Sequence, residues 1–538
     1  MDIASKKNDG VVCGFVRKGE YYDSVSLMII SKKIKDREGD GIIDSSVVMA
    51  TKDNILNLKQ AGLYLAKFES AEESDLVVAI RVQEESGDSG DSGDLLKTIE
   101  LEIKNLNKKD DTKNDGLASV CGGSVDVNLM NANLALISVN GRYAGDLALK
   151  ALNNNTHVML FSDNVPLETE VELKQLARKK KLLVMGPDCG TAIIAGVPLA
   201  FANEVRRGSI GVVGASGTGM QEVTTLISNF GGGISHAIGT GGRDIKKEVG
   251  GISFLMALQM FKDDPQTKVI LLISKPPHKE VMNKIVKEVD GAKRVVAVFL
   301  GAENSSSSRG GIIFRDNLYE GALTAYKISC GKGENIDEEM KRVDDSAEAI
   351  ARGERKKIKN NNVGRYPKYL RGLYSGGTFV SEAQLVLDFE KEEMFSNVPT
   401  HKSSKLEDAK ISCKNTIVDL GEDEFTMGKP HPMIDYSLRN ERLLKEILDP
   451  EVAVIMLDYV LGYGAHQDPM SDTISILKRA KDLLAKEKRY ISILATVTGT
   501  NKDPQNSDLV KEALKAAGVI VTDSNYQMSL IAKKIING

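Results

Sequence analysis

The sequence is poor in cysteine. Its 538 residues include only five, and no two of them form a C-x-x-C pair: Cys13, Cys121, Cys189, Cys330 and Cys413. This scatter argues against a zinc knuckle or a redox dithiol and is typical of reduced thiols. The six histidines show no spacing such as H-x-x-x-H. We therefore expect no metal site and no cofactor.

Long apolar runs are also missing. Nowhere do about 18 uninterrupted apolar residues occur, and no apolar segment of signal-peptide length follows the initial MDIASKKNDG. Lys and Arg number 71 against 75 Asp and Glu, which gives a net charge of −4 without a dense basic stripe. A nucleic-acid binder needs clustered cations. We expect a cytoplasmic protein that binds neither a membrane nor nucleic acid.

The remaining composition is that of a globular protein, with 41% hydrophobic and 27% charged residues. Short apolar runs alternate with helical patterns along most of the chain, which predicts α/β units with parallel sheets. Three such units are expected, at 1–205, 206–330 and 365–538. The first is interrupted by polar stretches at 86–94 and 108–123, and the strongly polar segment 331–364 is predicted to be a linker.

The sharpest local feature is SIGVVGASGTGM at 209–220, which leads into a helix with apolar residues at i, i+3, i+4 and i+7. Its turn consists of Ser216, Gly217, Thr218 and Gly219. Free N–H groups at a helix N-terminus suit a phosphate or a carboxylate. Neither G-x-x-x-x-G-K-[ST] nor G-x-G-x-x-G fits this segment. A tight turn in which glycine only permits close packing explains the pattern equally well.

A second turn of the same kind consists of Ser375, Gly376, Gly377 and Thr378. It also stands between an apolar strand candidate and an amphipathic helix. Two such turns on similar units could face one anion from opposite sides. We predict that they bind one anion between them.

Other candidates carry weaker signals. Asp188 and Cys189 follow a strand end, where α/β folds place ligands, and the thiol is either a nucleophile or inert packing. Gly241, Gly242 and Arg243 could bind a carboxylate through the guanidinium, and the alternative is a surface ion pair with Asp244.

Two proline-containing loops and one strand supply the last candidates. Lys275 precedes Pro276-Pro277, and His431 lies within Lys429-Pro430-His431-Pro432. These stiff loops line a cleft or simply turn. His236 follows a Gly-rich turn and is expected to be the histidine nearest the two-turn site.

Several long blocks carry a family resemblance, among them VMGPDCGTAIIAGVPLAFAN, GVVGASGTGMQE, SHAIGTGGRDIKKEVGGIS, LYSGGT and VDLGEDEFTMGKPHPMID. From about Val16 to the C-terminus the sequence resembles the FdrA family. More remotely it is similar to succinyl-CoA synthetase. The first two units resemble the α subunit of that ligase, as a Rossmann-like CoA-binding-type domain and a flavodoxin-like domain, and the third resembles the C-terminal domain of its β subunit.

The resemblance to the ligase fails at three points. The phosphorylated histidine of the G-H-A-G-A motif is missing where 308–313 reads SRGGII, and the ATP-grasp domain is absent. The Gly-rich CoA loop after the first strand is replaced by KGEYYD at 18–23. A chain of this kind is expected not to be phosphorylated by ATP on histidine.

The FdrA resemblance implies a subunit of oxamate carbamoyltransferase, which with other subunits converts oxalurate and phosphate into oxamate and carbamoyl phosphate during allantoin degradation. On this hypothesis Arg243, Lys275 and His236 are the catalytic candidates, and the two turns bind phosphate. The substrate pocket would include Asp188, Cys189, Gly241, Gly242 and His431. The alternatives are an acyl-CoA synthetase-like enzyme and a non-catalytic scaffold subunit.

Overall fold

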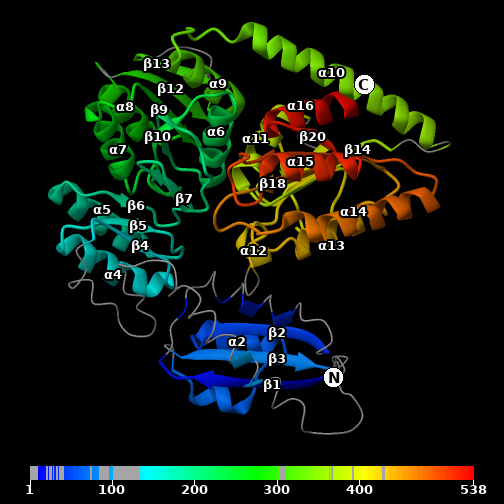
Figure 1. Cartoon of the computed structure of the whole chain (residues 1–538), viewed down its shortest axis with the longest axis horizontal. Coiled ribbons are helices and arrows are strands. Elements are labelled where there is room, and N and C mark those ends of the chain that lie inside the picture. The colour runs from blue at the N-terminus through cyan, green and yellow to red at the C-terminus, as the bar shows by residue number, and fades with distance from the viewer. Residues whose placement is uncertain are drawn as a thin grey trace. The chain divides into compact units, whose positions relative to one another are not determined.

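The structure is a computed structural model (Figure 1). It describes residues 10–19, 22, 27, 30–31, 34–35, 41–72, 75–83, 96–97, 99–100, 132–289, 291, 293–302, 310–362, 364, 367–389, 393–426 and 430–538. The polar stretches predicted at 86–94 and 108–123 lie outside these residues. The chain divides into one unit of residues 1–131 with 427–430, and a second of 132–426 with 431–538.

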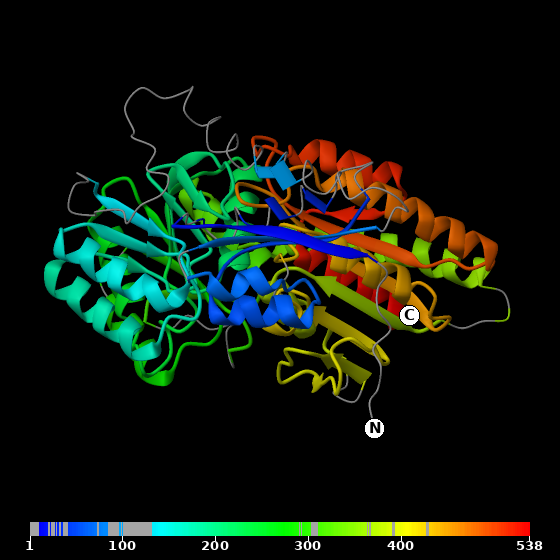
Figure 2. The ribbon, with the colours of Figure 1, turned by 90° about the horizontal axis from the view of Figure 1, so that it is seen from below.

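The first unit contains a three-stranded sheet of β1 (Val11–Arg17), β3 (Leu76–Val82) and β2 (Ile42–Met49), in that order. Helix α2 (Lys52–Gln60) and the short helix η1 (Ala66–Ser70) connect β2 to β3. The three strands lie side by side in Figure 1, and Figure 2 shows the same blue sheet from below. Every residue of the central strand β3 is buried, because both neighbours and two apolar clusters cover it.

The direction predicted for these three strands is wrong. Both β1 and β2 pair with β3 in antiparallel register. Apolar runs indicate that strands exist, but they do not specify the direction of pairing. The stretch at 18–23 therefore follows a strand of a separate antiparallel unit, and its comparison with the CoA loop of the ligase was misplaced.

The second unit begins with a small parallel sheet in the order β4-β5-β6. Its strands alternate with two helices: β4 (Leu134–Ile137), α4 (Gly141–Asn153), β5 (His157–Leu160), α5 (Leu167–Lys180) and β6 (Val184–Met185). A hairpin follows, formed by β7 (Thr191–Ile194) and β8 (Val197–Ala200). This hairpin does not join the small sheet and instead forms the edge of the next one.

A seven-stranded sheet with the order β13-β12-β11-β9-β10-β7-β8 comes next. Its new elements are β9 (Arg207–Gly214), α6 (Gly217–Asn229), β10 (Ile234–Gly239), α7 (Ile252–Asp263), β11 (Val269–Ser274), α8 (Lys279–Val289), β12 (Arg294–Phe299), β13 (Ile312–Arg315) and α9 (Leu318–Ser329). Helices α6 and α9 pack on one face of this sheet, and α7 and α8 cover the other (Figure 1).

A second seven-stranded sheet is parallel throughout, with the order β16-β15-β17-β14-β18-β19-β20. Its elements are β14 (Tyr369–Tyr374), α11 (Gly377–Leu387), β15 (Met394–Ser396), β16 (Ser404–Lys405), β17 (Asn415–Asp419), α12 (Asp423–Thr426), α13 (Ser437–Glu446), β18 (Val452–Val460), α14 (Pro469–Lys486), β19 (Ser492–Thr498), α15 (Ser507–Ala516), β20 (Ile520–Thr522) and α16 (Asn525–Ile536). The two large, mostly parallel sheets confirm the predicted α/β class.

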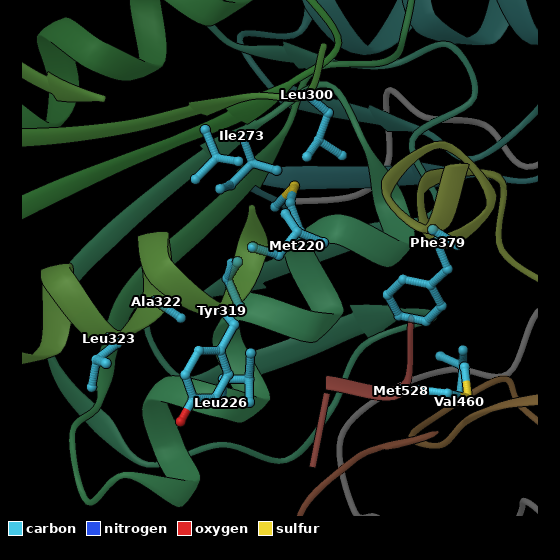
Figure 3. Close-up of a cluster of buried hydrophobic side chains, with 14 of the residues drawn as sticks. Met220, Leu226, Ile273, Leu300, Tyr319, Ala322, Leu323, Phe379, Val460 and Met528 are labelled. Atoms are coloured by element: carbon cyan, nitrogen blue, oxygen red, sulfur yellow. The ribbon is translucent and has the colours of Figure 1, made fainter. Parts of the chain in front are cut away.

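One apolar core joins the two large sheets. Helices α6 and α9 of the first half and α11 and α16 of the second contribute to the same buried cluster. Figure 3 shows Met220 of α6 near Ile273 and Leu300, while Phe379 of α11 lies toward Met528 and Val460. Because this core is continuous, the beginnings of α6 and α11 are held at fixed positions relative to each other.

The predicted linker is largely a helix. Residues Asp337–Asn361 form α10, which runs beside α16 (Figure 1). Its charged composition suggested a solvated segment, but Ala347, Ala351 and Ile358 form a narrow buried stripe. The buried Glu354 on the same face accepts hydrogen bonds from the hydroxyls of Tyr490 and Ser492. A polar helix with one buried stripe is easily mistaken for a linker.

Candidate anion-binding site

The two glycine-rich turns meet. Each follows a central strand, β9 or β14, and opens the helix after it, α6 or α11. The hydroxyls of Ser216 and Thr378 share a hydrogen bond across the junction. A Cβ atom on Gly376 would lie 2.7 Å from the side chain of Thr218. Glycine is thus required for this close approach, and the turns that the sequence analysis paired do lie face to face.

The turn of α6 has free donors. Met220 is the first residue of α6 whose N–H donates a main-chain hydrogen bond, and its acceptor is the carbonyl of Ser216. Among the described residues, no acceptor faces the N–H groups of Gly217, Thr218 and Gly219. Gly217 is exposed, so solvent or a solute reaches this helix end. Three free N–H groups at the positive end of a thirteen-residue helix can hold an anion.

The turn of α11 differs, because part of it is already occupied. The buried carboxylate of Asp458, on β18, accepts the N–H groups of Ser375 at 2.8 Å and Gly376 at 3.1 Å. The guanidinium of Arg439 lies 3.5 Å from the same carboxylate and stacks between two tyrosine rings. Burial raises the pKa of Asp458, while Arg439 lowers it. An internal anion is thus bound directly before α11, at the two residues that precede Gly377, and the N–H of Phe379 donates to the Gly376 carbonyl.

A second carboxylate faces the start of α11. A Cβ atom on Gly377 would lie 2.5 Å from an oxygen of Asp419, which is buried at the end of β17. Burial, together with the nearby carboxylates of Glu422 and Asp458, raises the pKa of Asp419 to about 7, although the exposed Lys275 acts to lower it. The predicted candidate Lys275 therefore lies within electrostatic reach of the paired turns. Its role in catalysis stays a prediction.

Asp188 and Cys189 lie at the end of the small sheet. Burial raises the pKa of Asp188 to about 6, Asp163 raises it further, and Arg243 lowers it. The buried Cys189 thiol faces the carbonyls of Thr191 and Gly239, and burial raises its pKa to about 12. A thiol that is protonated at neutral pH is a poor nucleophile. This geometry favours the packing alternative for Cys189.

Arg243 is engaged within the protein. Gly241 and Gly242 place it beside the 186–188 loop, where a Cβ atom on Gly241 would lie 2.2 Å from the Pro187 carbonyl. Its Nε lies 2.8 Å from the buried carboxylate of Glu170, and Nη2 donates to the carbonyl of Val165. The predicted alternative, a surface pair with Asp244, is wrong.

Asp244 is instead buried and belongs to a network that sequence reasoning missed. Lys174 of α5 donates to both Asp244 and Glu170 at 2.8 Å. Asp244 also accepts the N–H groups of Ser253 and Phe254 at the start of α7. The i,i+4 spacing of Glu170 and Lys174 on one helix is the signal that could have indicated this network.

The expectation that His236 is the histidine nearest the paired turns is wrong. It pairs in register with Gly211, three residues before the end of β9, and its Nδ1 accepts the N–H of Ala195. His431 lies closer, because a Cβ atom on Gly421 would be 2.7 Å from its Nε2 and 3.0 Å from the Ser375 carbonyl. Burial lowers the pKa of His431 to about 4, so its imidazole is neutral.

No described helix is long and apolar enough to cross a membrane. No group of three or more His, Cys, Asp or Glu side chains in the described part of the chain could hold a metal ion.

Three family profiles match the sequence. Residues 373–535 match "CoA-ligase", residues 205–301 match "CoA binding domain", and residues 12–116 match "AllF, heavy metal-associated domain". The last description implies a heavy-metal ligand set. Residues 12–116 contain one cysteine, Cys13, and no histidine. Soft metals need several thiolate or imidazole ligands, so these residues do not fit such a site.

A protein of Escherichia coli (strain K12) described as "Uncharacterized protein YahF" is 42% identical over 523 residues, which are 97% of this chain and 98% of the relative. YahF is an FdrA-type protein. The chain belongs to the FdrA family. The α1 subunit of succinate–CoA ligase [ADP-forming] from Archaeoglobus fulgidus is 28% identical over 34% of this FdrA chain and 62% of the relative. The α subunit from Aquifex aeolicus is 30% identical over 34% and 60%.

Solved structures give only distant matches. PH0766 from Pyrococcus horikoshii OT3 shares 14% identity over 79% of this chain and 88% of that chain, with a TM-score of 0.33. The dinucleotide-forming acetyl-coenzyme A synthetase 1 of Ca. Korarchaeum cryptofilum shares 13% identity over 78% and 86%, also with a TM-score of 0.33.

The predicted enzyme class, a carbamoyltransferase, is wrong. Two of the matched profiles are a CoA-ligase and a CoA-binding domain, and the relatives from Archaeoglobus fulgidus and Aquifex aeolicus are named as succinate–CoA ligase subunits. The FdrA chain is a succinyl-CoA synthetase-like protein. Oxamate and carbamoyl phosphate, which the resemblance implied as substrates, have no support.

Proposed function

We propose that the chain is a subunit of an acyl-CoA synthetase-like enzyme and holds a phosphate or acyl-phosphate group at the turn of α6. The observation that carries this proposal is the pair of facing helix N-termini. Only α6 has its first three N–H groups free, because the third N–H of α11, on Phe379, donates to the Gly376 carbonyl. The CoA-ligase and CoA-binding matches cover both halves of this pair.

The proposed reaction is the exchange of an acyl group between CoA and phosphate. The carbon–sulfur bond of an acyl-CoA breaks, a bond between that carbon and a phosphate oxygen forms, and the thiol leaves with the proton of hydrogen phosphate. Fixed N–H donors contribute by positioning the phosphate and stabilising its charge. Asp419, at the end of β17, faces the start of α11 and, with a pKa of about 7, can give or take a proton at neutral pH.

Partner subunits belong to the proposal. The related succinate–CoA ligases are named as subunits, and this chain lacks the ATP-grasp domain that loads phosphate in such ligases. We expect a partner to supply the nucleotide site. The AllF name of the N-terminal profile supports a place in allantoin degradation, which stays part of the proposal.

The direct test is calorimetric titration of the full chain with inorganic phosphate. Gly217→Asp places a carboxylate beside the free N–H groups, and the 3.6 Å to the Thr191 hydroxyl leaves room for the new Cβ. Because a carboxylate in the first turn favours the helix, the variant should fold. We expect at least about a tenfold loss of phosphate affinity, corresponding to ~1.4 kcal/mol or more.

A matched control adds the same charge elsewhere. Gly353→Asp changes an exposed glycine of α10 with open space around it and should bind phosphate like the wild type. Phosphate-dependent release of free thiol from succinyl-CoA, measured with a thiol reagent and the partner subunits present, tests the reaction. Wild-type phosphate affinity in Gly217→Asp would refute the site, and phosphate-independent thiol release would refute the reaction.

A further inference from the structure

A cavity of about 380 Å³ lies away from the paired turns. Leu134 and His157 are the first residues of β4 and β5, so this wall belongs to the amino end of the small sheet. His236 of β10 pairs with Gly211 of β9, and β9 ends three residues later, next to the turn of α6. At ~3.3 Å per residue, His236 therefore lies ~10 Å along the sheet from that end of β9. The cavity is therefore separate from the proposed anion site.

Most of the cavity wall is apolar. Its side chains come from the small sheet, from β7 and β10, and from the end of α7, and they include Met185, Ile194, Ile238, Met260 and Phe261. Phe261, Ile238 and Met185 are buried, whereas Met260 is 43% exposed and stands at the opening. A pocket of this size with one aromatic wall suits a small flat molecule.

Two histidines supply the hydrogen-bond donors. Nδ1 of His157 accepts the Leu183 N–H at 2.9 Å, and Nδ1 of His236 accepts the Ala195 N–H at 3.1 Å. Because both Nδ1 atoms accept, Nε2 carries the hydrogen on each ring. Burial lowers the pKa of both groups, so the imidazoles are neutral at pH 7. No described residue accepts a hydrogen bond from either Nε2–H.

Asp264 supplies an acceptor. It follows α7, lines the cavity, and lies close enough to His236 to raise the pKa of that imidazole. One of its oxygens accepts only the Gln266 N–H, which leaves a lone pair for a ligand. The cavity thus combines two neutral N–H donors and one carboxylate acceptor with an apolar wall. An anionic ligand would lose its hydration there without a compensating cation.

We propose that this cavity binds a neutral heteroaromatic ring of the purine type, either as a free base or as part of a nucleoside. A flat ring would lie against Phe261 and Met260. Its ring nitrogens would accept from the imidazoles of His157 and His236, and an exocyclic amine would donate to Asp264. The proposal does not depend on the phosphate site or on the proposed reaction.

The test is calorimetric titration of the full chain with adenine and, separately, with adenosine. His157→Phe and His236→Phe keep a planar ring of similar size and remove the N–H donors. The exposed His401 gives the matched control, His401→Phe. We expect adenine or adenosine to bind the wild type and the control equally, and each cavity variant to bind at least about tenfold more weakly. The tighter of the two ligands distinguishes a free base from a nucleoside.

A second variant guards against misfolding. Met260 is exposed at the opening, so Met260→Trp should fold normally and close the cavity. We expect it to abolish binding while phosphate affinity stays unchanged. Absence of binding of both ligands to the wild type at millimolar concentration would overturn the proposal. So would wild-type affinity in Met260→Trp, or in both histidine variants.

Discussion

Helices α6 and α11 begin with the same kind of turn, yet the two turns use their N–H groups differently. At α6 the first three N–H groups are free, whereas at α11 the N–H of Phe379 donates to the Gly376 carbonyl. Asp458 accepts the N–H groups of Ser375 and Gly376, the two residues before that helix. The acceptor comes from β18, 83 residues after Ser375. Similar local sequences therefore do not make equivalent sites, because a carboxylate from a distant strand can occupy one of them.

The same two helices are alike one turn further on. Glu222 of α6 accepts the N–H of Asn525 at the start of α16, and Glu382 of α11 accepts the N–H of Leu318 at the start of α9. Each carboxylate thus caps a helix of the other half, and the two halves are joined by a crossed pair of hydrogen bonds. The two helices are therefore alike at Glu222 and Glu382. They differ in the hydrogen bonding of their first residues, where a ligand would bind.

The largest effect is expected from removing the internal anion. Asp458→Asn leaves the buried guanidinium of Arg439 without its carboxylate. Because an unpaired buried charge is costly, we expect the free energy of unfolding to fall by about 3–5 kcal/mol in chemical denaturation. Asp146→Asn on the exposed face of α4 is the control and should change it by less than about 0.5 kcal/mol. A loss below about 1 kcal/mol for Asp458→Asn would contradict this role.

The crossed carboxylates predict a pH dependence of stability. Burial raises the pKa of Glu222 and of Glu382 from 4.5 to about 7. Between these values the folded protein binds more protons than the unfolded chain, so the free energy of unfolding falls as pH rises and levels off above about 7. The double variant Glu222→Gln/Glu382→Gln should reduce the difference between pH 5.5 and pH 8 by about 3–4 kcal/mol.

The exposed Glu512→Gln is the control for that pair and should keep the wild-type pH profile. Denaturation curves at several pH values measure the effect. If the double variant loses as much stability at pH 8 as at pH 5.5, the two carboxylates do not titrate as their burial implies.

Asp419 should make anion binding at the turns depend on pH. Sulfate is the probe, because it stays a dianion from pH 6 to pH 8. Above its pKa of about 7, Asp419 is charged and repels the anion, so we expect affinity to fall about threefold to tenfold over this range. Asp419→Asn should bind sulfate with the same affinity at both pH values, while the exposed Asp482→Asn follows the wild type. A pH dependence retained by Asp419→Asn would assign it to another group.

The smallest effect separates the two threonines. Thr378→Val removes the hydrogen bond to Ser216, whereas the Thr218 hydroxyl has no hydrogen-bond partner among the described residues. We expect Thr378→Val to lower the free energy of unfolding by ~1 kcal/mol and Thr218→Val to change it by less than ~0.5 kcal/mol. Equal losses in the two variants would show that packing, and not the hydrogen bond, holds the turns together.

Much of the fold of the two large sheets was predictable, because buried parallel strands are continuous runs of Val, Ile and Leu. The apolar runs at 269–273 and 452–457 lie within β11 (Val269–Ser274) and β18 (Val452–Val460). The hairpin of β7 and β8 was missed, since its strands have four residues each and include a proline. The antiparallel pairing of β1, β2 and β3 was missed because strand patterns carry no direction.

The candidate site was predictable only in part, for a similar reason. Glycine-rich turns before amphipathic helices mark helix ends in the sequence, and both turns lie where that pattern placed them. The sequence does not indicate which side chains accept hydrogen bonds at these helix ends. Asp458 sits within an apolar strand, and Glu170 reaches Arg243 from another helix, so neither contact follows from local spacing.

The central claim is that the turn of α6, and not that of α11, binds an external anion. Soaking crystals of the full chain in selenate and recording anomalous diffraction at the selenium edge tests it directly. The account predicts one anomalous peak within hydrogen-bond distance of the N–H groups of Gly217, Thr218 and Gly219. A peak beside Ser375 and Gly376 with Asp458 displaced, or peaks only elsewhere on the molecule, would contradict it.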